Sequence, residues 1–108
     1  MARLIALYRK PSNTAAFDDY YYRTHLPIAM TIPGLRRYEV SSGVVATPQG
    51  ESPYHLAAIL SFDSMDAIRQ ALGSPEGQAT VADVPRFASG GCWFMFDDEV
   101  VLIPYALA

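Results

Sequence analysis

His25 is one of only two histidines in the chain, and its position could support proton transfer. Phe17, Tyr21 and His25 recur at every fourth residue, so they share one face of a predicted helix. An imidazole on a face that packs toward a sheet could act as a general acid or base, because both of its forms are accessible near neutral pH. The spacing fits equally well a structural histidine that caps the helix end or fills the core.

Tyr21 and Asp83 are the residues expected to assist His25. The phenol of Tyr21 could orient a substrate oxygen in an apolar cleft, or it could pack in the core. Asp83 ends a second helical region just before Val84 and Pro85. Its carboxylate could fix one tautomer of His25, or it could bond backbone groups of the turn. The candidate catalytic residues are therefore His25, Tyr21 and Asp83.

His55, the second histidine, lies in a predicted strand and out of phase with Leu56. Strand alternation places it on the same side as Ala57 and Ile59. We therefore expect an interface or surface role for His55, and no part in any chemistry.

The sequence favours neither a metal nor a cofactor. The two histidines have no local ligand spacing, and a catalytic zinc needs three protein ligands. The acidic triplet Asp97–Glu99 lacks the spacing of a calcium loop, and the chain contains neither a GxGxxG nor a Walker A motif. Nothing beyond His25, a conceivable axial ligand, calls for haem. Cys92 begins an apolar strand, so we expect its thiol to be buried and unreactive.

The elements that must position these residues follow the order β-α-β-β-α-β, the ferredoxin-like pattern. Pro27 disfavours helical geometry at Leu26, so the first helix is predicted to end near His25. The fold class is α+β, with one four-stranded antiparallel sheet and one domain over residues 1–108. The predicted strands are 3–10, 36–45, 54–62 and 92–96, and the helices are 13–25, 64–73 and 74–83, with a loop at 47–53, a turn at 97–99 and a short strand or tail at 100–105.

Two of the predicted strands are apolar on both faces. One presents Leu56 and Leu60 on one side and Ile59 on the other, and the last presents Phe94 on one side and Trp93 on the other. A sheet with one face in water alternates apolar with polar residues. A second copy of the chain is the simplest cover for the open face.

Composition excludes several classes of protein. The 108 residues carry a net charge of -3 and a pI of about 5.1, which argues against nucleic-acid binding. Arg36 and Arg37 are too few to form a basic patch. The single cysteine excludes an internal disulfide, and no run is long and apolar enough for a membrane span. The N-terminus lacks a signal-peptide cleavage site, so the expected location is cytoplasmic.

Five short motifs, in this order, resemble the EthD-like family of the dimeric α+β barrel superfamily. They extend from Phe17 to about Gly91. The motifs are Phe17, Tyr21, His25, Pro27 and Ala29; Ile32, Pro33, Gly34, Leu35 and Tyr38; Phe62, Asp63 and Ser64; Ser74 to Gln78; and Ala82, Asp83, Pro85, Phe87 and Ala88.

The resemblance implies a homodimer whose two sheets pack face to face. It also implies a cleft between each sheet and its own helices, where superfamily members bind aromatic or polyketide-like molecules. Related enzymes isomerise lactones, decarboxylate or dehydrate phenolic acids, or oxidise polycyclic phenols, often without a cofactor. Other members are accessory proteins of catabolic operons.

Three hypotheses follow from the residues and the resemblance together. The first, which the resemblance favours, is a cofactor-independent lyase or isomerase of a small cyclic or aromatic catabolic intermediate, with His25 as the proton-transfer group. The second is a non-catalytic ligand-binding or accessory protein of a catabolic pathway. The third is an EthD-type reductase, which would need an external electron donor. The expected partners are a second copy of the chain and a small apolar or aromatic ligand.

Overall fold

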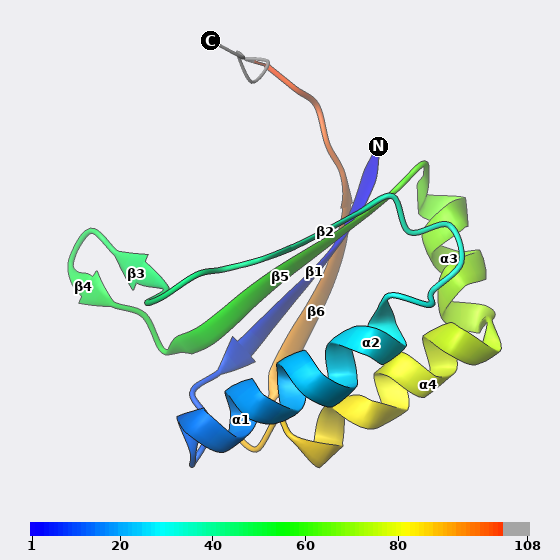
Figure 1. The fold of residues 1–108 in the computed structure, drawn as a ribbon. Helices are drawn as coiled ribbons and strands as arrows, with labels where there is room; N and C mark the ends of the chain where they lie inside the picture. Colours follow the sequence, from blue (N-terminus) through cyan, green and yellow to red (C-terminus); the bar gives the residue numbers. More distant parts are fainter. Residues whose placement is uncertain (103–108) are drawn as a thin grey trace, which may run out of the picture.

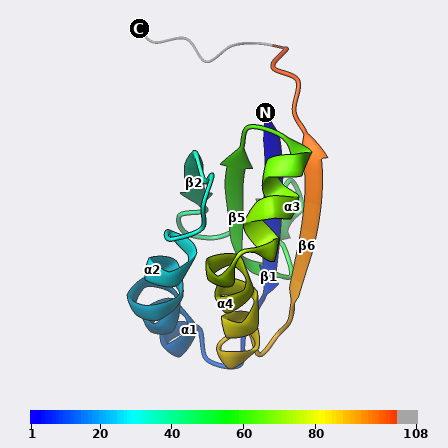
Figure 2. The same cartoon turned by 90° about the vertical axis from the view of Figure 1, so that its right-hand side faces the viewer.

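A four-stranded antiparallel sheet with helices on one face forms the frame of the molecule (Figures 1 and 2). A computed structural model describes residues 1–102. The strand order is β2-β5-β1-β6, as in the predicted ferredoxin-like α+β fold. The sheet consists of β1 (Ala2–Arg9), β2 (Arg37–Val40), β5 (Tyr54–Phe62) and β6 (Cys92–Asp98), and a separate hairpin contains β3 (Ala46–Thr47) and β4 (Gly50–Glu51).

The first helical segment runs farther than the sequence predicts. It comprises α1 (Thr14–Tyr20), a π-helical turn (Tyr21–His25) and α2 (Leu26–Ala29). The prediction that Pro27 ends the helix near His25 is therefore wrong. The amide of Leu26 bonds back to the carbonyl of Tyr21, five residues earlier, and this wider turn carries the chain past a proline that has no amide to donate.

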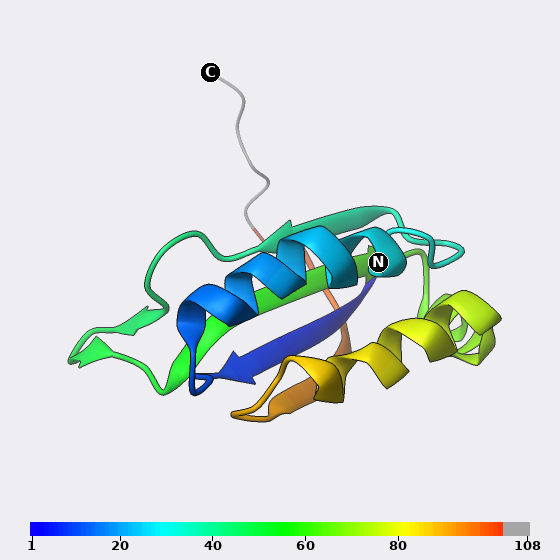
Figure 3. The same ribbon diagram turned by 60° about the horizontal axis from the view of Figure 1, so that its bottom comes forward.

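The second helical region begins and ends as predicted. Ser64 caps α3 (Met65–Gly73) by accepting from an amide in its first turn, and Ser74 caps α4 (Pro75–Asp83) in the same way. A 3-10 turn (Val84–Arg86) follows. Figure 3 shows the α1–α2 segment and α4 side by side over the same face of the sheet. At Gly77 a side-chain carbon would lie 2.0 Å from the carbonyl oxygen of Ala71, so only glycine permits this close turn between the helices.

Two strand boundaries and one turn differ from the predictions. β2 ends at Val40 rather than at residue 45, and the hairpin β3–β4 occupies part of the predicted loop. β6 continues to Asp98 and so includes two residues of the predicted turn, because both pair with β1 and the Arg3 guanidinium donates to Asp97 at 2.6 Å. Residues 100–102 form no strand, and the remainder of the predicted final strand lies outside the described residues.

The core lies between the sheet and the helices. Alternate residues of β1 and β5 face it, together with Phe17 and Tyr21 from the first helical segment. On the opposite, open face, Trp93 is 60% exposed and Met95 is 44% exposed, so both faces of the sheet are apolar, as predicted. No helix within residues 1–102 is long and apolar enough to cross a membrane.

Candidate functional site: two histidine–carboxylate pairs

His25 and Asp83, which lie 58 positions apart in the chain, meet between the helices. The imidazole Nδ1 is 3.0 Å from Oδ2 of Asp83. His25 lies in the π-helical turn and Asp83 is the last residue of α4, so the packing of these two segments brings them together. Both residues are 2% exposed or less. Because a carboxylate can only accept, Nδ1 carries the proton and Nε2 carries the lone pair of a neutral imidazole.

Tyr20 and Arg86 complete the surroundings of Asp83. The hydroxyl of Tyr20 donates to Oδ1 of Asp83 at 2.6 Å, and the Arg86 guanidinium lies 3.8 Å from the same oxygen. Each carboxylate oxygen therefore has a polar partner, as a buried charge requires. Tyr20 is not among the candidate residues that the sequence suggested. Three consecutive tyrosines span about 200° of helix, so a neighbour of Tyr21 had to face a different surface, and that surface is α4.

Burial controls the protonation of His25. It lowers the pKa of the imidazole, and the hydrogen bond and charge of Asp83 oppose that shift without reversing it. The ring of Phe87 lies 4.7 Å from the imidazole, centroid to centroid, and adds to the apolar enclosure. The neutral form of His25 is therefore favoured at neutral pH.

Tyr21 contacts His25 through its ring and not through its hydroxyl. The two ring centroids are 5.3 Å apart, whereas the Tyr21 hydroxyl lies 2.7 Å from the hydroxyl of Tyr38 on β2. Burial raises the pKa of the Tyr21 phenol, so it stays protonated. The structure thus joins His25 directly to Asp83 and places Tyr21 beside them in a separate pair with Tyr38.

His55 does not lie where strand alternation places it. Tyr8 pairs with Leu56 and Arg9 pairs with Tyr54, so His55 is an extra residue of a β-bulge. The bulge turns its side chain to the helical side, where Nε2 lies 2.7 Å from Oδ1 of Asp18 on α1. The predicted placement beside Ala57 and Ile59 is therefore wrong.

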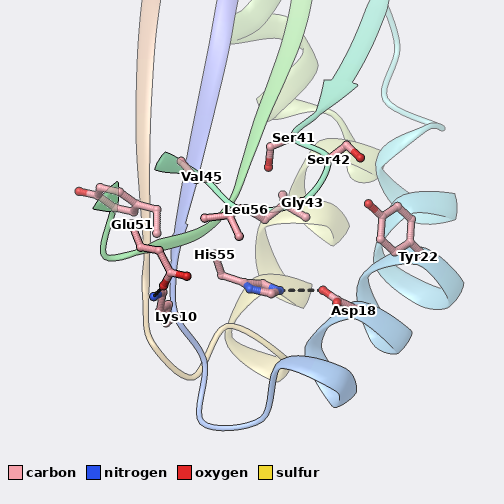
Figure 4. Close-up of a pocket in the computed structure, with 12 residues that line it drawn as sticks. Lys10, Asp18, Tyr22, Ser41, Ser42, Gly43, Val45, Glu51, His55 and Leu56 are labelled. Carbon is pink, nitrogen blue, oxygen red and sulfur yellow. Dashed lines mark hydrogen bonds and ion pairs between the residues drawn. The ribbon is translucent and has the colours of Figure 1, made fainter. Parts of the chain in front are cut away.

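Two cavities lie close to these histidine–carboxylate pairs. One, of about 320 Å³, is lined by Asp18, Tyr22 and His55 (Figure 4). The other, of about 240 Å³, is lined by Tyr20, Arg86 and Phe87. Neither is lined by His25, Tyr21 or Asp83, although the second is bounded by three residues that contact the His25–Asp83 pair. Phe17 touches the rings of both His55 and Phe87.

The remaining candidate groups are not arranged for metal or thiol chemistry. Within residues 1–102, no three histidine, cysteine, aspartate or glutamate side chains gather closely enough to hold a metal ion. Burial raises the pKa of the Cys92 thiol to about 12, so the thiolate is scarce near neutrality.

Comparison with known proteins identifies the family. The EthD domain matches residues 9–91. An uncharacterized 11.0 kDa protein from the thcB–thcC intergenic region of Rhodococcus erythropolis is 39% identical over 105 residues, which cover 96% of this chain and all of the relative. The crystal structure of an EthD family protein from Bacillus halodurans is 37% identical, covers 93% of this chain and 99% of its own, and superposes with a TM-score of 0.86.

More distant structures share the fold. The cofactor-independent oxygenase SnoaB from Streptomyces nogalater is 15% identical, with a TM-score of 0.67 over 96% of this chain and 97% of its own. A dimeric ferredoxin-like protein of unknown function from Thermobifida fusca is 18% identical, with a TM-score of 0.66 over 89% of this chain and 88% of its own. The fold is that of the dimeric α+β barrels, and the chain belongs to the EthD domain family.

Proposed function

We propose that the chain is a cofactor-independent lyase or isomerase that acts on a small cyclic or aromatic catabolic intermediate, with His25 as the proton-transfer group. The observation that carries this proposal is the His25–Asp83 pair, whose geometry assigns the proton to Nδ1 and leaves a lone pair on Nε2. Membership of the EthD family fits a small-molecule catabolic role. The distant neighbour SnoaB is itself described as cofactor-independent.

The Nε2 atom is the reactive position in this proposal. Within residues 1–102, Nε2 of His25 has no hydrogen-bond partner. Every fully buried side-chain nitrogen or oxygen in the same residues has a partner, so Nε2 is not fully buried. The small exposed fraction of His25 therefore includes Nε2. The cavity lined by Tyr20, Arg86 and Phe87 lies one side chain away and is the proposed approach for the substrate.

The proposed reaction is a proton transfer between two carbon atoms. Nε2 of neutral His25 takes a proton from a carbon next to a carbonyl, and the electron pair moves toward the carbonyl oxygen. The imidazolium is stabilised by Asp83 and then returns the proton to a different carbon, which completes an isomerisation. No electron acceptor is required, because the substrate and the product have the same oxidation state.

Tyr21 is proposed to help orient the substrate oxygen through its pair with Tyr38. The two hydroxyls carry two protons, and one proton suffices for the hydrogen bond between them. The second O–H can donate to a substrate carbonyl. The free O–H of the Tyr21–Tyr38 pair supports the orienting role of Tyr21, even though the Tyr21 hydroxyl does not contact His25.

A homodimer through the open face of the sheet is part of the proposal. The exposed side chains of Trp93 and Met95 lie on that face, opposite to the helices and both histidine pairs. A monomer would leave this apolar surface in water. The dimeric neighbour from Thermobifida fusca has the same fold.

One observation favours the second hypothesis, a ligand-binding or accessory protein without catalysis. His25 is 2% exposed, and its neighbours rather than its own ring line the adjacent cavity. In that case His25 and Asp83 would stabilise the packing of the two helices. The reductase hypothesis has no comparable observation in its favour.

Proton exchange separates the two alternatives. The dimer is incubated in D2O with a panel of unsaturated lactones and phenolic acids, and uptake of deuterium at carbon is followed by NMR. We expect exchange with at least one compound, and a loss of about 10²–10⁴-fold in His25→Ala. Asp66→Asn, in which an exposed helical carboxylate changes, is the control and should retain the wild-type rate. Equal rates of deuterium exchange in the wild type and in folded His25→Ala would exclude His25 as the proton-transfer group and favour the accessory role.

A further inference from the structure

The cavity lined by Asp18, Tyr22 and His55 is a pocket built around the β-bulge at His55. Its walls are α1, the loop after β2 and the first residues of β5 (Figure 4). Its volume of about 320 Å³ is at the lower end of the range of about 300–1,000 Å³ that is typical of small-molecule sites, which favours a ligand of one or two rings. A β-bulge changes the direction of one side chain, and here it directs the imidazole of His55 into the pocket.

Two contacts fix the imidazole of His55 in the pocket. Asp18 holds Nε2 at 2.7 Å, and the ring of Phe17 packs edge-on against it with centroids 4.9 Å apart. The side chain is 20% exposed, so it remains accessible from the pocket. Among residues 1–102, Nδ1 of His55 and the hydroxyl of Tyr22 make no hydrogen bond, which leaves both atoms available to a ligand.

The charged groups of the pocket already have partners. Lys10 and Glu51 form an ion pair with 2.8 Å between Nζ and Oε2, and Oδ1 of Asp18 lies 2.7 Å from Nε2 of His55. The remaining lining combines hydroxyl groups, as on Ser42, with apolar surface. Such a pocket offers no unpaired cation to a carboxylate or a phosphate, because its only lysine is already paired.

We propose that this pocket binds an uncharged cyclic or aromatic molecule that carries hydroxyl or carbonyl groups, and that His55, held by Asp18, hydrogen-bonds an oxygen of that molecule. Aromatic and apolar walls hold the ring, and His55 and Tyr22 fix its orientation. The site is distinct from the position at which His25 is proposed to act, and it does not depend on that chemistry.

Catechol, which is uncharged at pH 7, is the probe for this site, and benzoate is its anionic counterpart. Titration of the 15N-labelled dimer should shift the amide signals of residues 18–22, 41–45 and 54–56 with catechol, while benzoate binds at least about tenfold more weakly. We expect His55→Ala and Asp18→Asn each to weaken catechol binding by about tenfold, the effect of one lost hydrogen bond. Asp66→Asn is the matched control for Asp18→Asn and should bind as the wild type does.

The outcomes separate this inference from the proposed function. His25→Ala should lose proton exchange and retain catechol binding within twofold, whereas His55→Ala should lose binding. The assignment is overturned if catechol at 5 mM (about the upper end of weak specific binding) causes no shifts, or shifts only at other residues. It is also overturned if both folded variants, His55→Ala and Asp18→Asn, bind catechol as tightly as the wild type. If His55→Ala fails to fold, Tyr22→Phe, which removes one hydroxyl from a half-exposed side chain, provides the test by a weakening of at least about twofold.

Discussion

Each of the two histidines holds an aspartate, yet the two pairs lie in different surroundings. His25 and Asp83 are almost completely buried, whereas the side chains of His55 and Asp18 are 20% and 50% exposed. Phe17 contacts both surroundings, since its ring packs against that of His55 and against that of Phe87, which in turn packs against His25. Because it is buried, the His25–Asp83 pair has a fixed geometry and a defined tautomer. Because it is partly exposed, the His55–Asp18 pair is accessible to a ligand.

The largest expected difference between the pairs is in stability. Asp83→Ala leaves the Tyr20 hydroxyl and the His25 Nδ1–H without their acceptor in a buried site. We expect the free energy of unfolding to fall by about 2–4 kcal/mol, measured by urea denaturation at a fixed protein concentration. Asp18→Ala breaks a half-exposed pair and should cost about 1 kcal/mol or less. Equal losses in the two variants would remove the distinction.

A second prediction concerns the sheet face that neither pair touches. Ile59 lies half-buried on the open face, so Ile59→Asp should place an unpaired carboxylate in the proposed dimer interface. We expect the dimer to weaken by at least about 2 kcal/mol, seen as dissociation in sedimentation at micromolar concentration. The ring signals of both histidines should keep their positions. Val81→Asp, at an exposed apolar residue of α4, is the control and should remain dimeric.

The pH dependence of stability should follow from the buried pair. Burial lowers the pKa of folded His25 below the usual value of 6.5, so the unfolded chain binds the additional proton first. The stability contributed by neutral His25 is therefore complete above pH 6.5 and is lost as the pH falls through 6.5 toward the lower folded pKa. The slope cannot exceed about 1.4 kcal/mol per pH unit for one proton. Urea denaturation from pH 7.5 to 5.5 should show this slope in the wild type, and His25→Asn should flatten it.

The smallest expected effect is that of His55 on folding. His55→Asn removes the contact with Asp18 but leaves the bulge, which is a property of the backbone pairing. We expect the free energy of unfolding to change by about 1 kcal/mol or less. A loss as large as that of Asp83→Ala would show that His55 is a core residue rather than a pocket residue.

Local signals in the sequence predicted much of the frame that holds these pairs. β5 begins after Pro53 and ends before the cap Ser64, and α4 lies between Ser74 and Val84, as the capping and proline rules indicate. The spacing of four residues between Phe17, Tyr21 and His25 correctly predicted a buried helix face, since each of the three is at most 2% exposed.

Features that depend on contacts distant in sequence were not predictable in the same way. The π-helical turn overrides the local effect of Pro27, and it does so within a helix that packs on α4. His55 was placed on the wrong face because a bulge arises from the register between two strands, and neither strand alone encodes it. Tyr20 as a partner of Asp83 likewise depends on how two helices meet.

The protonation state of His25 tests most directly whether Asp83 holds this imidazole as a base. Long-range 1H–15N correlation spectra of the uniformly 15N-labelled protein at pH 7 contain the ring nitrogens of only two histidines. We predict that His25 is a neutral imidazole with its proton on Nδ1 and a lone pair on Nε2, and that Asp83→Ala abolishes this preference. A proton on Nε2, or on both nitrogens, would contradict the assignment of His25 as a base held by Asp83.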